Sequence, residues 1–584
     1  MWLRMGISFI SGLMYKYLMD KRILLTLSAL LFVFSLSFSQ NLSPDEILRS
    51  IVSQRGQAEV TVAYTSGKQL DHLTGNLSVA SVKDKRIHIM LSPRTAEWFI
   101  SQHYEYEIIV RDDSKGLVGA ANVGEAAEWE SYPTYTQYDS IMRKFTADFP
   151  LLCRLDTIGT SIYGKLILAL KISDNAGSNE DEPEVFYTST IHGDETGGFI
   201  LMLHLADYIL KNYNISTGVK NLVDNLEIWI NPLSNPDGAY RSGNTITSPT
   251  RFNANGIDLN RNYPDPEEPG KVYEKETTGM INFMRKHNFI LSANFHSGAE
   301  VVNYPWDRWF RLHADNDWFY SISRSYADTV HKHSVAGYMT YLENGVTNGY
   351  DWYKINGGRQ DFVTYELHGR EVTIELDDNY ITPVVQLSNL WEYNHRSLLH
   401  YLENAMYGIH GKVVDAHTSV PVPARIFIKG HDKDSSHVYS DALTGRFVRL
   451  IAPGSQNLFF TADGYEDLMV NDVVVNEGQV TDLLVEMHSA INPVDTVETP
   501  LPVLYPNPSE TILRVVLPER QYGSINIMIF NMTGVKVADY NTATMKDIPV
   551  LIDVGHFPAG TYVVVFTNSM TKAVDKGRFV VIPR

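Results

Sequence analysis

The sequence of 584 residues has one cysteine, Cys153, so no disulfide can form within the chain and no cysteine-rich metal cluster can exist. Basic residues are also few: 49 Lys and Arg against 68 Asp and Glu give a formal net charge of -19. This charge argues against binding to nucleic-acid phosphates or to an anionic membrane surface. Hydrophobic residues make up 44% and charged residues 20%, which excludes a disordered or collagen-like chain.

The sequence has one long apolar run, residues 23–38, and none after it is long enough to span a bilayer. The run follows Lys21 and Arg22 and ends in small residues. This order predicts a signal peptide over residues 1–39, with no transmembrane segment left after cleavage. A membrane anchor is the alternative, although no positive cluster follows the run. Met19 is a second candidate start of the chain.

Changes in hydrophobic pattern divide the remaining sequence. Residues 40–125 mix helical and alternating segments and predict a small α+β domain or a propeptide. Residues 126–406 alternate strands with long helices, which predicts an α/β fold with a mixed, largely parallel twisted sheet and helices on both faces. Short period-2 strands predict all-β sandwich domains at 407–488 and 504–584, joined by a Pro- and Thr-rich linker at 489–503.

The strongest chemical signal is HGDETGG at 192–198, directly after the strand-like segment EVFYTSTI. His192 and Glu195 lie three positions apart there, and His296 ends a second strand-like segment, FILSANF. Strand ends in an open α/β sheet border a common crevice. Imidazole and carboxylate groups are the ligands of catalytic zinc sites. Each histidine alone could be a buried core residue, whereas the three residues together are consistent with one zinc site.

Five motifs occur in order along the chain: HGDETGG (192–198), NPDG (235–238), RFNANGIDLNRNYPD (251–265), ANFHSGAEVVNYPWD (293–307) and GGRQD…VTIEL (357–376). Together they resemble the motifs of the zinc metallocarboxypeptidases, and the resemblance extends from about residue 126 to residue 406. The short spacing before GIDLNRN and the sequence NYPWD resemble the regulatory branch of that family, which includes carboxypeptidases N, E and D.

The resemblance implies a metal centre with one Zn²⁺ per chain, bound by His192, Glu195 and His296. It implies that Glu375 is the general base beside the zinc-activated water. A strand-end salt bridge is the alternative role of this glutamate. Asp258 matches the carboxylate that orients the first histidine.

The resemblance also implies residues that bind the substrate. Arg251 matches the arginine that stabilises the oxyanion. Asn260, Arg261 and Tyr353 match the residues that hold the free α-carboxylate, a task suited to the planar arginine fork. Without the surrounding motifs, Arg261 would be read as a surface charge and Tyr353 as a half-buried aromatic. This clamp predicts an exopeptidase that acts on the C-termini of peptides and proteins.

The predicted specificity is for C-terminal Lys or Arg. Asp307 matches an aspartate in the side-chain pocket of the regulatory branch, and Gln360 matches a second polar residue of that pocket. A buried carboxylate without a cationic partner is costly, so a basic substrate side chain would complete the pocket. Arg359 could neutralise Asp307, but we expect it to point to solvent. The alternative is that Asp307 only caps a loop.

The two C-terminal regions also resemble known domains. Residues 407–488 resemble the transthyretin-like domain of the regulatory branch, for which we expect a structural role. Residues 504–584 resemble the C-terminal sorting domain read by the type IX secretion machinery, with YPNPS, IFNMTGVKV and PAGTYVVVF in order. A carbohydrate-binding or adhesion module is the alternative. The chain is therefore expected to be exported through the periplasm of a Gram-negative bacterium and secreted or attached to the cell surface.

The combined prediction is a secreted zinc carboxypeptidase. A zinc peptidase or amidase that trims cell-wall peptides is a second reading, and an inactive binding or adhesion protein is a third. All the chemical positions are filled, so the sequence does not support inactivity. The sequence leaves the physiological substrate, the oligomeric state, any calcium site and the role of residues 41–125 open.

Overall fold

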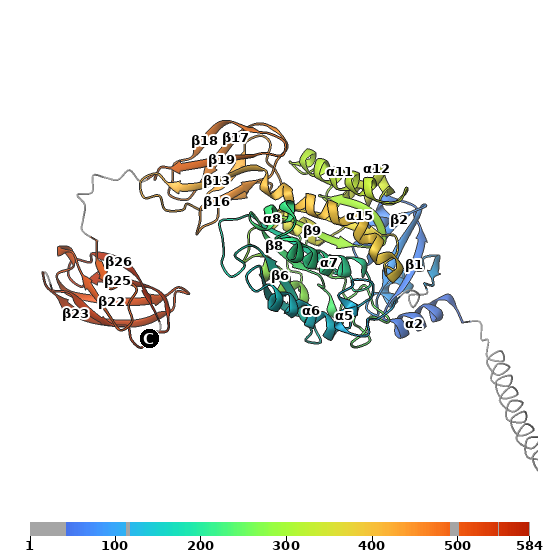
Figure 1. Ribbon diagram of the computed structural model, residues 1–584, viewed down its shortest axis with the longest axis horizontal. Coiled ribbons are helices and arrows are strands. Elements are labelled where there is room, and N and C mark those ends of the chain that lie inside the picture. Colours follow the sequence, from blue (N-terminus) through green and yellow to red (C-terminus); the bar gives the residue numbers. More distant parts are fainter. Residues whose placement is uncertain (1–41, 112–116, 491–500, 547, 583–584) are drawn as a thin grey trace, which may run out of the picture. The chain divides into compact units, whose positions relative to one another are not determined.

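The computed structural model describes residues 42–111, 117–490, 501–546 and 548–582 (Figure 1). The predicted signal peptide and residues 491–500 of the predicted linker lie outside this part. The chain forms two compact units, one up to Ala490 and one from Ile491 onward. Among the described residues, no helix combines the length and the apolar character that crossing a membrane would need.

The described part of the N-terminal region begins with a helix and continues as four strands and two short helices. Ser43 caps the first helix, because its side chain accepts from the Glu46 backbone while Glu46 bonds back to the Ser43 backbone. The four strands form an antiparallel sheet in the order β2-β3-β1-β4, so β2 is an edge strand. The elements are α2 (Pro44–Arg55), β1 (Ala58–Ala63), α3 (Gly67–Thr74), β2 (Ser78–Lys83), β3 (Arg86–Leu91), α4 (Ala96–Ser101) and β4 (Tyr106–Ile109).

The next region contains an eight-stranded mixed sheet in the order β11-β10-β12-β9-β7-β8-β6-β5. Its four central strands, β12, β9, β7 and β8, run parallel, and antiparallel pairs flank them on both sides. The fold class predicted from the sequence is therefore confirmed. The strands are β5 (Cys153–Thr160), β6 (Leu166–Ile172), β7 (Glu184–Ser189), β8 (Glu227–Asn231), β9 (Phe289–His296), β10 (Ala299–Tyr304), β11 (Val346–Asn348) and β12 (Arg370–Asp377).

Helices cover both faces of this sheet, because the central strands are apolar on both sides. In β7, Val185 and Tyr187 pack into the core beneath α6, α7, α11 and α15, whereas Phe186 packs into the opposite core beneath α10 and α14. The helices are α5 (Val123–Ala126), α6 (Tyr135–Asp148), α7 (Gly197–Asn212), α8 (Thr217–Val223), α9 (Pro236–Ala239), α10 (Lys275–Met284), α11 (Asn316–His333), α12 (Tyr341–Gly345), α13 (Gly349–Trp352), α14 (Arg359–Glu366) and α15 (Val384–Glu403). Short 3₁₀ turns occupy Leu259–Arg261 and Asn404–Met406.

The cysteine lies at the start of β5 in the first core. Its side chain is buried, and its sulfur donates a weak bond to the Phe149 carbonyl at 3.5 Å. Burial raises the pKa of the Cys153 thiol to about 12. The thiol is therefore neutral and packed as a small apolar group.

A β-sandwich follows the mixed sheet, with sheets β16-β13-β19 and β15-β14-β17-β18 around one apolar core. A buried ion cluster joins this sandwich to the preceding region. Asp315 bonds to Arg370 at 2.7 Å, to Arg449 at 2.7 Å and to His431 at 2.9 Å. Burial raises the pKa of Asp315, but the two guanidinium groups outweigh it and hold that pKa well below its usual value. The strands are β13 (Gly408–Asp415), β14 (Arg425–Ile428), β15 (Val438–Tyr439), β16 (Arg446–Arg449), β17 (Gly454–Thr461), β18 (Leu468–Val475) and β19 (Val480–Met487).

The C-terminal unit is a second β-sandwich with a core of its own. Its sheets have the orders β20-β21-β24 and β23-β22-β25-β26. The expected all-β character of both C-terminal regions is thus observed. The strands are β20 (Val503–Tyr505), β21 (Ile512–Val516), β22 (Gly523–Asn531), β23 (Lys536–Thr544), β24 (Val550–Asp553), β25 (Gly560–Asn568) and β26 (Val574–Val581), with a 3₁₀ turn at Glu519–Gln521.

Candidate functional site

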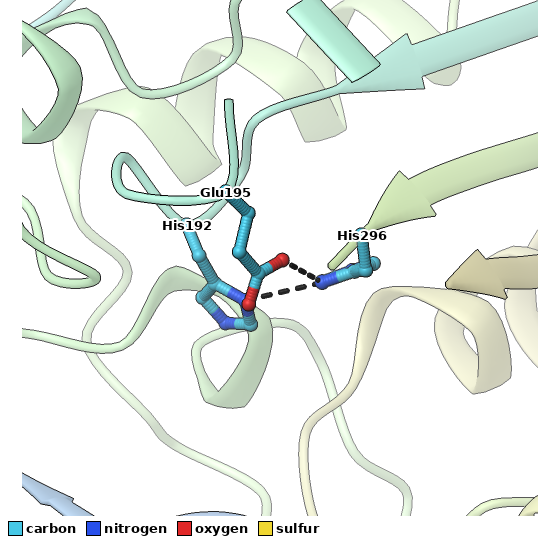
Figure 2. A group of neighbouring side chains, drawn as sticks. All are labelled: His192, Glu195 and His296. Carbon is cyan, nitrogen blue, oxygen red and sulfur yellow. Dashed lines mark hydrogen bonds and ion pairs between the residues drawn. The ribbon is translucent and has the colours of Figure 1, made fainter. Parts of the chain in front are cut away.

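The three residues proposed as metal ligands meet at the carboxyl ends of two neighbouring parallel strands. His192 and Glu195 lie in the turn between β7 and α7, and His296 is the last residue of β9. Figure 2 shows their side chains pointing toward one another from these two elements. Glu375 lies opposite His296 in the register of β12 against β9. The strand order therefore brings all four residues to one edge of the sheet.

The ligand atoms of His192, Glu195 and His296 all lie within 4.8 Å of one another. Glu195 Oε1 lies 2.8 Å from His192 Nδ1, and Glu195 Oε2 lies 2.7 Å from His296 Nδ1. The two Nδ1 atoms are 3.1 Å apart, so at most one of them carries a proton toward the other. Although burial raises the pKa of Glu195, the two histidines hold that pKa below its usual value. Two imidazole nitrogens and a carboxylate that face a common point fit a zinc ion.

The outer nitrogen of each histidine has a partner of its own. His192 Nε2 lies 2.9 Å from Asp258 Oδ1, as the sequence predicts for an orienting carboxylate. The amide of Asn294 lies 2.7 Å from His296 Nε2. These contacts fix both rings and leave the Nδ1 atoms directed at the site. Asn294 was not predicted, although its place two residues before His296 on a fully buried strand was a usable signal.

Nine of the eleven predicted site residues line one cavity. Asp258 lies behind His192, and Gln360 contacts the cavity through Asp307. The lining residues are Ala80, His192, Glu195, Arg251, Asn260, Arg261, His296, Ser297, Gly298, Asn303, Asp307, Trp352, Tyr353, Ile355, Thr373, Glu375 and Tyr380.

Glu375 borders this cavity, and one of its carboxylate oxygens has no hydrogen-bond partner in the described part of the chain. This oxygen is Oε2, and it is buried. Burial and the nearby Glu195 raise the pKa of Glu375 well above its usual value, and Arg251 opposes this shift. A cation held by the three ligands would also favour the ionised carboxylate. In its ionised form, Glu375 is placed to accept a proton from a group in the cavity.

Arg251 is buried and lies against the proposed ligands. Its Nη1 donates to Glu195 Oε1 at 2.8 Å, and its Nε donates to Ser78 Oγ at 2.8 Å and to Asp258 Oδ2 at 3.3 Å. Although burial lowers the pKa of Arg251, Asp258 and Glu195 raise it above its usual value. A permanent positive charge therefore borders the cavity.

The three residues predicted to hold a carboxylate lie together in the same cavity. Arg261 donates from Nη1 to the Asn260 carbonyl at 2.9 Å and from Nη2 to the Val79 carbonyl at 2.8 Å. Each of these nitrogens has a second hydrogen, and Arg261 Nε is buried without a partner in the described part of the chain. Tyr353 is buried, which raises its pKa to about 12. The Tyr353 hydroxyl is therefore a neutral donor at physiological pH.

Asp307 lies in a polar recess of the cavity. Its Oδ1 accepts from Asn303 Nδ2 at 2.9 Å and from Gln360 Nε2 at 3.1 Å. Burial raises the pKa of Asp307 to about 6, although the Asn303 bond lowers it. Asn303 was not predicted as a site residue. It belongs to the NYPWD segment and lies four residues before Asp307, so the motif contained the signal.

The prediction that Arg359 points to solvent is wrong. Its side chain is 1% exposed, and its Nη2 donates to Glu371 Oε2 at 2.9 Å. Glu371 is itself fully buried on β12, and a carboxylate in that position requires a charged partner. Arg359 therefore pairs with Glu371, and Asp307 keeps its two amide partners.

The N-terminal region contributes groups that the sequence did not reveal. Ser78 and Val79 of β2 contact Arg251 and Arg261, and Ala80 lines the cavity. Gln57 Nε2 donates to Asp194 Oδ2 at 2.8 Å. Isolated Ser, Val and Gln residues that lie 137 to 182 positions from their partners carry no sequence signal.

Two family models match the chain. The model described as zinc carboxypeptidase matches residues 138–397, and the model described as secretion system C-terminal sorting domain matches residues 503–581. The first match contains all the residues that we assigned to the metal and the substrate.

The curated relatives that the chain resembles are also carboxypeptidases. Human carboxypeptidase N catalytic chain is 31% identical over 396 residues, which cover 60% of this chain and 85% of that protein. The carboxypeptidase of Arabidopsis thaliana called SOL1 is 31% identical over 364 residues, which cover 60% of this chain and 71% of that protein. Human carboxypeptidase D is 32% identical over 375 residues, but the match spans only 26% of its length. Among solved structures, carboxypeptidase A from Helicoverpa armigera aligns with a TM-score of 0.47 and 18% identity, covering 60% of this chain and 97% of that one.

Proposed function

This chain belongs to the zinc carboxypeptidase family, and from that premise we propose that it removes single residues from the C-termini of peptides and proteins, preferring Lys or Arg. One zinc ion per chain is bound by His192, Glu195 and His296. When bound, zinc acts as a Lewis acid toward the peptide carbonyl and lowers the pKa of the attacking water molecule. The convergence of three electron-pair donors within 4.8 Å supports this metal centre.

Glu375 acts as the general base and then as the general acid. Its carboxylate lines the cavity and takes a proton from the attacking water. The carboxyl group then delivers that proton to the leaving amine. Arg251, which donates to Glu195, stabilises the negative charge that develops on the carbonyl oxygen.

Asn260, Arg261 and Tyr353 hold the α-carboxylate of the terminal residue. The guanidinium of Arg261 is anchored by two main-chain carbonyls, and its remaining hydrogens are available to the carboxylate. The neutral hydroxyl of Tyr353 donates a further bond. This clamp restricts the reaction to chain ends, because an internal residue has no free α-carboxylate.

The observation that supports the preference for basic residues is the set of unused acceptors around Asp307. Asn303 Oδ1 and Gln360 Oε1 are buried and have no hydrogen-bond partner among the described residues. Together with the Asp307 carboxylate they form an acceptor-rich recess. A guanidinium or ammonium group supplies several donors and a positive charge, so a terminal Arg or Lys satisfies this recess. An apolar terminal side chain would leave the acceptors desolvated and unpaired.

The experiment compares matched peptides that end in Arg, Lys, Leu or Phe. Wild type is expected to cleave the Arg and Lys peptides fastest, and Asp307→Ala is expected to lose most of that preference. Faster cleavage of the Leu or Phe peptides by wild type would refute the specificity. A full preference for basic ends in Asp307→Ala would refute the role of Asp307.

We further propose that the C-terminal unit directs the protein through the type IX secretion machinery. Support comes from the match to a secretion system C-terminal sorting domain over residues 503–581. The protein is then secreted or attached to the surface of a Gram-negative bacterium. The sandwich at 407–488 resembles a transthyretin-like domain, and its ion cluster at Asp315 supports a structural role.

A further inference from the structure

An edge strand of the N-terminal domain, defined here as residues 42–111, reaches the catalytic arginine. Ser78, the first residue of β2, donates from Oγ to Asp258 Oδ2 at 2.5 Å and accepts from Arg251 Nε at 2.8 Å. All three side chains are buried, at 4%, 7% and 4% exposure for Ser78, Asp258 and Arg251. Asp258 in turn bonds to His192. A single hydroxyl therefore links the N-terminal domain to both the arginine and the orienting carboxylate.

We propose that Ser78 is a positioning residue, which makes the N-terminal domain a working part of the active site. The inference rests on the proposed carboxypeptidase function. Ser78 holds Arg251 directly and holds His192 through Asp258. The hydroxyl donates its one proton to the Asp258 carboxylate and accepts a hydrogen bond from the Arg251 guanidinium through a lone pair, so one hydroxyl can make both contacts at once.

The geometry around Arg251 explains why the hydroxyl matters. Glu195 holds the Nη1 side of the guanidinium, and Ser78 is the nearer of the two partners of Nε, since Asp258 Oδ2 lies at 3.3 Å. Removing the hydroxyl leaves the longer Nε contact and takes one bond from a buried carboxylate. Hydrogen bonds to charged groups are stronger than neutral ones, so the loss would loosen both groups.

Two further contacts hold the N-terminal domain against the same residues. Gln57 Oε1 accepts from the backbone nitrogen of Arg251 at 2.7 Å, and the Val79 carbonyl accepts from Arg261 Nη2 at 2.8 Å. The N-terminal domain thus supplies three acceptors to the two arginines of the site.

Apolar packing fixes the position of this strand. Tyr353 and Ile355 belong to the same buried cluster as the core of the N-terminal domain. The guanidinium of Arg111 lies 4.4 Å from the centre of the Tyr380 ring, and Tyr380 lines the active-site cavity. Packed side chains therefore surround the hydrogen bonds between β2 and the two arginines. Such packing keeps the positioning groups in a fixed geometry.

The test uses the full-length, zinc-loaded chain with Ser78→Ala, Ser78→Thr and the control Ser81→Ala on the same strand. For an Arg-ending peptide, we expect kcat of Ser78→Ala to fall about tenfold with little change in KM, because Arg251 acts on developing charge. The zinc dissociation constant, measured by competition with a chromophoric chelator, should rise about tenfold, as is typical when a partner of a ligand is lost. Ser78→Thr keeps the hydroxyl and should lie closer to wild type in both measurements.

Thermal unfolding of each variant distinguishes a loss of positioning from a general loss of stability. Gln57→Ala is a second test of the contacts to Arg251, and we expect kcat of this variant to fall by about threefold. Wild-type kcat and zinc affinity in Ser78→Ala would overturn the proposal, and so would an increase in kcat, which would show that the strand obstructs the site. An equal loss in Ser81→Ala would also overturn it. If wild type itself lacks zinc-dependent carboxypeptidase activity, the proposed function fails, whereas the zinc affinities still test the role of Ser78.

Discussion

Gly349 approaches Asp307 so closely that no other residue fits at this position. A Cβ on Gly349 would lie 1.8 Å from Asp307 Oδ1 and 2.8 Å from Asn303 Oδ1. Both distances are far below van der Waals contact. The start of α13 thus forms the wall against which the Asp307 carboxylate is held, in the recess proposed to set specificity.

Gly349→Ala should therefore damage the recess and spare the metal centre. The added methyl must displace Asp307, so we expect kcat/KM for an Arg-ending peptide to fall about 100-fold, equivalent to about 2.7 kcal/mol. Zinc content should be unchanged. Gly177→Ala is the matched control, because a Cβ there meets no heavy atom within 4 Å. Wild-type kcat/KM in Gly349→Ala would contradict the close packing of this wall.

Glu375→Gln should keep zinc and lose turnover. The amide has almost the same shape as the carboxylate but cannot take a proton, so we expect kcat to fall by about 10³-fold. Metal analysis and steady-state kinetics on the same preparation check both parts. Near-normal turnover would show that another group is the base.

Metal removal should abolish activity, because the proposed reaction depends on the ion that we assign to His192, Glu195 and His296. Phenanthroline is expected to inactivate the wild type, and added Zn²⁺ should restore it. His296→Ala leaves two ligands, so it should purify without bound zinc. One tightly bound zinc per His296→Ala chain would rule out the ligand assignment.

Asp315→Asn should destabilise the protein without touching the cavity. The change leaves the buried guanidinium group of Arg370 without its anion and leaves Arg449 with Asp432 alone, so we expect a loss of about 3 kcal/mol in the free energy of unfolding at pH 7. Urea unfolding monitored by tryptophan fluorescence measures the difference. Asp328→Asn is the control, because the exposed pair with Arg324 contributes about 0.5 kcal/mol or less.

The difference in stability between wild type and Asp315→Asn should depend on pH. The folded pKa of Asp315 lies well below the ordinary value of 3.8, so the ionised carboxylate stabilises the folded state in full above that value. As the pH falls below 3.8 toward the folded pKa, the unfolded chain takes up the proton first and the stabilisation declines. The difference between wild type and Asp315→Asn should therefore narrow only in that acidic range. A constant difference down to the acid transition would contradict the ion cluster.

Deletion of residues 504–584 should leave an active enzyme that is not exported from the periplasm. The deleted residues form a compact unit with a separate apolar core, so the remaining domains keep their packing. Peptidase assays on the periplasmic and extracellular fractions check this expectation against the full-length chain. Equal amounts of truncated protein outside the cell would refute the sorting role.

Sequence patterns predict those site residues that directly follow a strand-like segment. His192, Glu195 and His296 follow strand-like segments directly, so strand order alone brings them together. Ser78 could not be found in this way, because its partner Asp258 lies 180 residues further along the chain and only tertiary packing joins them. Arg359 was misplaced for a related reason: its partner is a buried glutamate, and burial of that glutamate depends on how a helix packs on β12.

The buried thiol of Cys153 has a practical consequence. Its position in the core and its pKa of about 12 keep it protonated and out of reach of alkylating reagents. A cysteine introduced on the surface would then react alone with a maleimide dye. Pairs of such sites, one on the N-terminal domain and one beside the cavity, would allow fluorescence measurements of distance during substrate turnover without first removing a native residue.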